Sequence, residues 1–101
     1  MNLIIQIVNH EDRKLFYDLE ERIYILYLVL NHIMWYDVYI NVIEEEANIF
    51  LGHDGSLNLS KFESFVSQIA RFKPGLGRQS PWEERVLPRS FEDKIKNYFP
   101  S

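Results

Sequence analysis

The stretch from Ile23 to Ile43 constrains the fold more than any other feature, because it holds most of the apolar side chains of the domain. Four polar residues interrupt it, and a run of three glutamates, Glu44, Glu45 and Glu46, follows it directly. The stretch is long enough to cross a bilayer, but polar and charged side chains at its centre are expensive in lipid. We therefore expect it to form the core of a soluble domain.

Residues 34–43 alternate between two kinds of side chain. One set is apolar or aromatic throughout, and it consists of Tyr36, Val38, Ile40 and Val42. The other set mixes aromatic and polar residues, and it consists of Trp35, Asp37, Tyr39 and Asn41. Strict alternation is typical of a β-strand with one buried face.

Residues 23–30 fit two structures. Their Ile, Tyr and Val side chains favour a strand, and Asn31-His32 would then form the turn of a hairpin, since Asn tolerates a positive φ. Alternatively, one helix could extend from the preceding segment to residue 33, because five apolar residues lie near a single helical stripe. These are Leu15, Leu19, Leu26, Leu30 and Ile33. The strand is the favoured interpretation.

The segments before this stretch predict one strand and one helix. Residues 3–8 are rich in β-branched side chains, which indicates a buried strand. Asn9 is a good helix cap, and the two acids that follow it suit the first turn of a helix. With apolar residues at helical spacing, this pattern predicts a helix over residues 10–22.

The segments after it predict a turn and three helices. Asp54-Gly55, between apolar runs, is typical of a hairpin turn. Ser60 with Glu63 resembles a capping box, which predicts that Ser60 caps a helix over residues 61–72. Two shorter helices are expected behind Ser80 and Ser90, each of which precedes an acid by three residues.

These elements predict a single α+β domain over residues 1–101, sheet-rich in 1–59 and helical in 60–101. The chain is long enough for one hydrophobic core. We expect a four- to five-stranded mixed or antiparallel sheet with the helices packed mainly on one side.

The residue types limit which catalytic and metal-binding sites the chain can form. The chain has no cysteine, which excludes disulfides, thiolate metal sites and cysteine nucleophiles, and which fits a cytoplasmic protein. Its histidines, His10, His32 and His53, lie far apart in the sequence and match no metal-binding pattern. No serine lies in a nucleophile motif. We therefore expect no metal, no cofactor and no catalytic residue.

The charge is uneven along the chain. Residues 1–60 carry ten acids and three bases, whereas residues 61–101 carry five acids and eight bases. An acidic surface repels nucleic acid and attracts basic proteins. The expected partner is thus a basic protein, with no binding to nucleic acid or membrane.

The exposed-face aromatics give the most specific hypothesis. Tyr and Trp are enriched among the residues that dominate protein interfaces, and acidic side chains beside them suit a basic partner. The predicted partner-binding residues are Trp35, Asp37, Tyr39, Glu44, Glu45, Glu46 and Asp54. The alternative is that the C-terminal helices cover this face and make it part of the core.

In its small size, acidity and lack of cysteine the chain resembles bacterial immunity proteins and antitoxins that block nuclease toxins, or phage-encoded inhibitors. That resemblance implies neutralisation of a basic enzyme by covering its active site. Two other functions stay open. One is a structural subunit, for instance in a homodimer, and the other is a small acid–base enzyme that uses Asp37 with His32 or His53.

Overall fold

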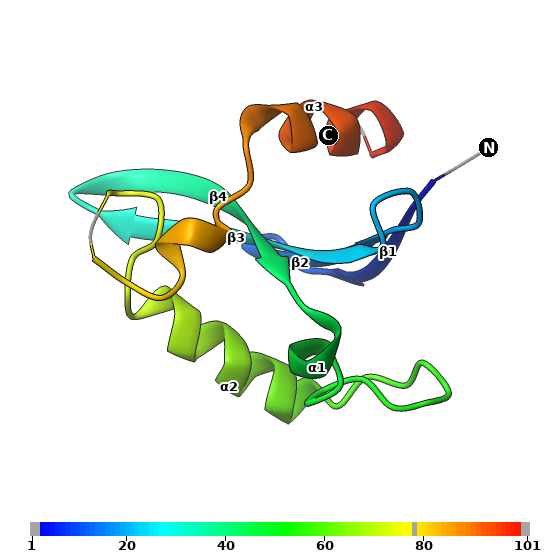
Figure 1. The fold of residues 1–101 in the computed structure, drawn as a ribbon. Coiled ribbons are helices and arrows are strands. Elements are labelled where there is room, and N and C mark those ends of the chain that lie inside the picture. Colours follow the sequence, from blue (N-terminus) through cyan, green and yellow to red (C-terminus); the bar gives the residue numbers. More distant parts are fainter. Residues whose placement is uncertain (1–2, 78, 100–101) are drawn as a thin grey trace.

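A computed structural model describes residues 3–77 and 79–99 and shows a four-stranded antiparallel sheet whose strands follow one another in chain order (Figure 1). The strands are β1 (Ile4–Asn9), β2 (Arg13–Asp18), β3 (Ile23–His32) and β4 (Met34–Val42). The helices are α1 (Glu44–Ala47), α2 (Leu59–Ala70), the short 3-10 helix η1 (Glu83–Arg85) and α3 (Arg89–Tyr98). The predicted α+β fold class is confirmed.

The long hairpin β3–β4 carries most of the stretch from Ile23 to Ile43. Its register runs from Tyr24 opposite Val42 to His32 opposite Met34, so residues 23–30 are strand, as favoured. The turn does not lie at Asn31-His32. Both of these residues still belong to β3, and Ile33 alone makes the reversal, with a φ of 66°.

The helix expected over residues 10–22 is wrong, because β2 occupies Arg13–Asp18. Leu15 and Phe16 are both buried, and they enter different apolar clusters on opposite faces of the sheet. A strand that is covered on both faces has no polar–apolar alternation, so its apolar residues can match helical spacing by chance. Asn9 ends β1 and caps no helix.

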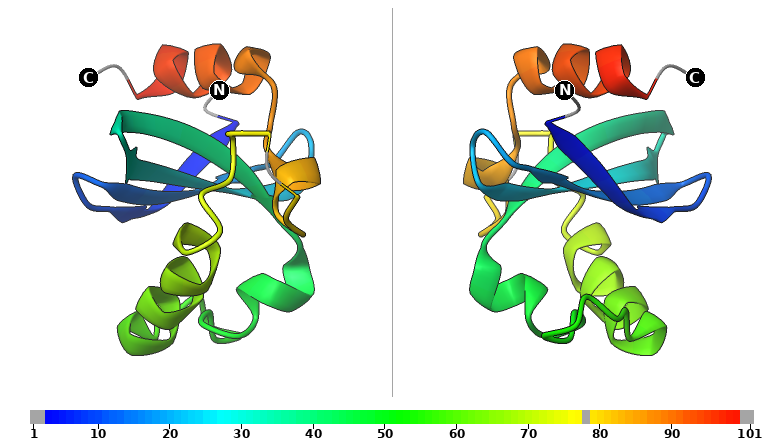
Figure 2. Two further views of the ribbon diagram at one scale, coloured as in Figure 1. Left: turned by 90° about the vertical axis from the view of Figure 1, so that its left-hand side faces the viewer. Right: turned by 90° about the vertical axis from the view of Figure 1, so that its right-hand side faces the viewer.

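The sequence suggested that the helices pack mainly on one side of the sheet, but they lie on both sides. Helices α1 and α2 lie against one face of the sheet, and α3 lies against the other (Figure 2). We call these the α2 face and the α3 face. On the α2 face Leu26 and Ile40 pack against Phe50 and Phe62, and on the α3 face Ile25 packs against Ile95.

Two predicted helix caps are wrong. Helix α2 begins one residue before Ser60, and the side chain of Asn58 accepts the bond from the Lys61 amide at 3.1 Å. Helix α3 begins at Arg89 behind Pro88, so Ser90 lies inside it and makes no cap. Ser80 does orient the start of η1, since its Oγ accepts a bond from the Trp82 amide at 3.0 Å.

The Asp54-Gly55 turn is confirmed as a turn, but the strands expected on either side are reduced to one bridge between Leu51 and Leu57. Gly55 has a φ of 81°, and the Asp54 side chain accepts a bond from the Ser56 amide at 2.9 Å. A single bridge is too short to count as a pair of strands, so this segment is a loop closed by a turn and not a hairpin.

Side-chain contacts fix the C-terminal segment above the α3 face. Lys94 donates to the fully buried Asp18 at 2.8 Å, across 76 residues of sequence. Arg85 reaches both carboxylate oxygens of Glu46 at 2.7 Å, and the Leu87 amide donates to the Tyr39 carbonyl at 2.8 Å. The first contact joins α3 to β2, the second joins η1 to α1, and the third joins the segment between η1 and α3 to β4.

The cap of α2 gives a first prediction. Replacing Asn58 with Ala removes the acceptor of the Lys61 amide and should lower the free energy of unfolding by about 0.5–2 kcal/mol. Ser60→Ala is the matched control, since Ser60 is exposed and caps nothing, and it should change stability much less. Urea unfolding of both variants decides this. Equal losses would contradict the assignment of the cap.

The Lys94–Asp18 pair gives a second prediction, on pH. Burial alone would raise the pKa of Asp18, but hydrogen bonds from Lys94 and from the Glu20 and Glu21 amides outweigh it and hold the pKa below its ordinary value. The charged Asp18 therefore stabilises the fold above about pH 3.9, the pKa of an unfolded Asp, and this stabilisation is lost as the pH falls through the lower pKa of the folded state.

Lys94→Met should consequently cost about 1–3 kcal/mol at neutral pH, because it leaves a buried charge without its strongest donor. The difference from the native protein should shrink on acidification, when Asp18 becomes protonated in both. Lys96→Met is the control, since Lys96 pairs with Glu92 on the surface of α3. A loss that did not depend on pH would rule out this account of the pair.

Candidate functional site

The tip of the β3–β4 hairpin exposes three consecutive large apolar side chains. Ile33 is 97% exposed, Met34 72% and Trp35 70%. The tip extends beyond α3 on one face, and in Figure 1 it projects to the left of the molecule. We call these three residues the hairpin tip. Trp35 lies on the α3 face of β4, together with Asp37 and Tyr39, as the alternation predicts.

Asp37 lies where the covered and uncovered parts of the α3 face meet. Its Oδ2 accepts a bond from the Tyr27 hydroxyl at 3.2 Å. Tyr27 faces Tyr39 across the two strands, with ring centroids 5.0 Å apart. On the side of β2, the Lys14 ammonium lies 5.7 Å from the centroid of the Tyr27 ring. The carboxylate is thus held beside a pair of aromatic rings.

Three adjoining hollows share Asp37 in their walls. The first, about 470 Å³, lies between β4, Gly75 and the start of α3. The second, about 250 Å³, lies beneath α3 among Tyr27, Tyr39 and Phe99. The third, about 320 Å³, is open to solvent and is lined by Tyr27, Val29, Trp35, Tyr36 and Asp37. We call the third the Trp35 hollow.

Both tyrosines beside Asp37 are held in their protonated form. Burial raises the pKa of Tyr27 to about 12, and the charge of Asp37 and its hydrogen bond add to this. Burial likewise raises the pKa of Tyr39 to about 12, helped by Tyr27 and by the Glu92 and Asp37 charges. At neutral pH each hydroxyl can donate a hydrogen bond.

Charged residues of α3 border the site on its covered side. Glu92 accepts bonds from Lys96 at 2.9 Å and from Arg89 at 2.8 Å. The bond from Lys96 is the main cause of the lowered pKa of Glu92, and Arg89 adds to it. Lys96 also lies close enough to Asp37 for their opposite charges to attract, so α3 supplies a cation on the covered side of the carboxylate, although Lys96 donates its hydrogen bond to Glu92.

The predicted binding residues divide between two surfaces. Trp35 and Asp37 are exposed near the hairpin tip, and Tyr39 is half-buried under α3, so the C-terminal helix covers part of this face but not its aromatic end. Glu44, Glu45 and Glu46 form α1 at the other end of β4. At about 3.3 Å per residue, roughly 23 Å of strand separates Trp35 from Val42.

At that other end the exposed acids come from two elements. Glu44 and Glu45 are exposed in α1, whereas Glu46 is bound to Arg85. The β2–β3 turn brings Glu20 and Glu21 to the same end of the sheet, because Asp18 pairs with Ile23 and Tyr24 with Val42. We call Glu20, Glu21, Glu44 and Glu45 the acidic end.

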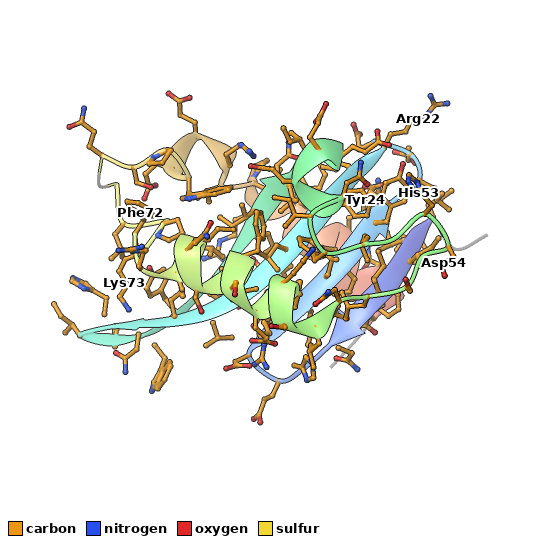
Figure 3. All side chains as sticks on the ribbon, turned by 90° about the horizontal axis from the view of Figure 1, so that it is seen from below. Arg22, Tyr24, His53, Asp54, Phe72 and Lys73 are labelled. Atoms are coloured by element: carbon orange, nitrogen blue, oxygen red, sulfur yellow. The ribbon has the colours of Figure 1, made fainter. Side chains whose placement is uncertain are left out.

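Figure 3 shows the loop with His53 and Asp54 on the side of the molecule that carries Arg22, away from Phe72 and Lys73. Asp54 therefore lies on the side of the acidic end and not near the hairpin tip. No histidine lines the three hollows around Asp37. Asp37 therefore does not share any of them with His32 or His53.

Sequence reasoning missed Tyr27, Ile33 and Met34. The signal for the last two was present, since they directly follow the predicted turn, where an apolar run has nothing to pack against. Tyr27 could not be found in the same way. Its role depends on which residue of β4 lies opposite it, and the misplaced turn left that register undetermined.

Residues 3–77 and 79–99 contain neither a metal-binding cluster nor a membrane-spanning helix. No group of three or more histidine, aspartate or glutamate side chains is arranged to hold a metal ion there. None of the helices in this described part combines the length and the apolar character needed to cross a membrane.

Comparison of the chain with known protein families, with curated proteins and with solved structures gave no match.

The exposure of Trp35 gives a third prediction. In a Trp82→Phe background, which leaves Trp35 as the only tryptophan, its fluorescence should be strongly quenched by acrylamide. Trp35→Ala should change the free energy of unfolding by no more than about 0.5 kcal/mol. Tyr39→Ala, two residues along the same face but under α3, should cost about 1–3 kcal/mol. A large loss with Trp35→Ala would show that the hairpin tip is part of the core.

Proposed function

We propose that the chain is a non-catalytic binding protein that neutralises a basic protein, such as a nuclease toxin, by covering its active site, in the manner of immunity proteins and antitoxins. The observation that carries the proposal is the hairpin tip. Three neighbouring large apolar side chains are exposed there beside a carboxylate, on a strand pair that projects from the domain.

The hairpin tip suits an interface anchor for energetic reasons. Full burial of an exposed apolar side chain is favourable by about 1.5–3 kcal/mol, so a partner that covers the hairpin tip would gain binding free energy. Trp is among the commonest interface hot spots, because it buries a large area with few rotatable bonds. The pairing of β3 with β4 up to His32 and Met34 fixes the strands that carry the tip before any partner arrives.

The acidic end supports a basic partner. The chain as a whole has a net charge of −4, and an acidic surface accelerates the approach of an oppositely charged protein. Within the acidic end Lys94 pairs with Glu20 at 3.4 Å, so Glu21, Glu44 and Glu45 contribute most of its negative charge. The anchor and the charge act on different rate constants. Apolar contacts mainly slow dissociation, whereas charges outside the contact mainly speed association.

This division gives a fourth prediction, measured with basic enzymes, nucleases first, that are encoded by genes next to that of this chain. The purified chain should inhibit one of these enzymes with a one-to-one end point. Trp35→Ala should accelerate dissociation by about thirtyfold, as expected for an anchor of about 2 kcal/mol. Glu44→Lys with Glu45→Lys should slow association and weaken its dependence on salt.

The matched control is Asp93→Lys, an exposed acid on α3 that belongs neither to the hairpin tip nor to the acidic end. It should leave dissociation unchanged. The proposal is wrong if neighbouring basic enzymes are neither bound nor inhibited, or if Trp35→Ala and the glutamate reversals leave both rate constants as they are.

One observation favours a structural subunit as a second candidate. Strand β1 lies at the edge of the sheet, carries no charged residue and leaves Ile5 48% exposed. Such an edge can pair with the same strand of a second copy. Sedimentation at rising protein concentration tests this, and Ile5→Lys should abolish any dimer that forms.

A further inference from the structure

We propose that the Trp35 hollow receives an arginine side chain of the partner, with its guanidinium between the Trp35 ring and the Asp37 carboxylate. The inference rests on the proposed function, because it names the chemical group by which a basic partner is recognised. It concerns a different step, since a partner can be anchored by the hairpin tip without using the hollow.

The lining of the hollow suits a cation. Three of its five residues are aromatic, and Asp37 is the only charged one. A cation above an aromatic face is attracted by the negative charge of the π-system, most strongly by that of Trp. An anion would be repelled by Asp37, and an apolar group would cover the carboxylate without replacing its water.

The carboxylate of Asp37 has room for another donor. In the described part of the chain, the hydrogen bond recorded for it is the one from Tyr27, at a rather long 3.2 Å. Two carboxylate oxygens can accept about four bonds. Because a fork of two N–H groups fits such a carboxylate well, arginine can add two bonds without displacing Tyr27.

The nearby cations of the chain itself do not fill this place. The Lys96 ammonium donates to Glu92 at 2.9 Å and attracts Asp37 only from the hollow beneath α3, and neither Lys96 nor Glu92 lines the Trp35 hollow. Lys14 stacks on Tyr27 and belongs to the hollow beneath α3. Both lie on the covered side of Asp37, so the side that faces Trp35 stays open to a group from outside.

Arginine fits better than lysine for geometric reasons. The guanidinium is planar, stacks on an aromatic ring and remains able to bind a carboxylate through its edge. It is also more weakly hydrated than an ammonium, so less water has to be removed on binding. The open side and the flat Trp35 ring match this plane, whereas a compact ammonium would use only one of the two contacts.

The test uses the native protein and a small probe, Nα-acetylarginine amide, followed by NMR of the indole N–H groups. The probe should shift the Trp35 signal saturably and leave the Trp82 signal in place. Nα-acetylcitrulline amide, which has the same shape without the charge, should give no saturable shift. Asp37→Asn should weaken the binding of the arginine probe by about fivefold or more.

Glu84→Gln is the matched control variant, since it removes one exposed acid of η1, outside the hairpin tip and the acidic end, and should leave binding unchanged. Thermal unfolding of Asp37→Asn checks that the fold is retained, as expected for an exposed residue. The inference is overturned if the citrulline probe or the corresponding lysine compound, Nα-acetyllysine amide, binds as well as the arginine probe, or if Asp37→Asn binds the arginine probe as tightly as the native protein.

The two proposals fail in different ways. If the basic nuclease is inhibited by native protein and Asp37→Asn alike and the arginine probe does not bind, the hollow is not the recognition site, but the inhibitor function stands. If the arginine probe binds through Asp37 and no basic enzyme is inhibited, the hollow stands and the inhibitor function is overturned.

Discussion

The whole structure depends on the need to bury both faces of a four-stranded sheet. Residues of β2 and β3 point apolar side chains to both sides, as Leu15 and Phe16 do in β2. A sheet of this kind cannot leave either face in water. The remaining chain therefore divides, with α1 and α2 on one face and α3 on the other (Figure 2). Helix α3 does not reach the end of the hairpin, which projects beyond it (Figure 1).

The incomplete cover leaves the candidate binding surface exposed. Where α3 covers the sheet, Tyr39 is half-buried and belongs to the core. Two residues further toward the tip the same strand face is open, and Asp37 and Trp35 are exposed. One strand thus passes from core to surface within a few residues, and the aromatic residues along it change from core packing to exposure, as the proposed binding requires.

How far the sequence predicted the structure depends on the kind of signal. The fold class and β4 followed from composition and strict alternation, which are local properties. The helix over residues 10–22 was wrong, because a strand buried on both faces lacks that alternation. The caps at Ser60 and Ser90 were wrong, because Asn58 and Pro88 stand just before them and compete for the same role. The distance between Trp35 and Glu44 depends on the length of β4, and the position of Tyr27 opposite Tyr39 depends on the register between β3 and β4. Neither of these is a local property of the sequence.

The order of the strands has a consequence for how the chain is made. Each strand pairs only with its neighbour in sequence, so the sheet needs no long-range closure and can form early. The contact between Lys94 and Asp18 spans 76 residues and can form only when the last helix is available. During synthesis the sheet is therefore complete while its α3 face is still bare, and Phe16, Tyr27 and Tyr39 are exposed to other chains. The ten residues of α3 end this vulnerable period, so a product that lacks them would be far more prone to aggregation than its small loss of mass suggests.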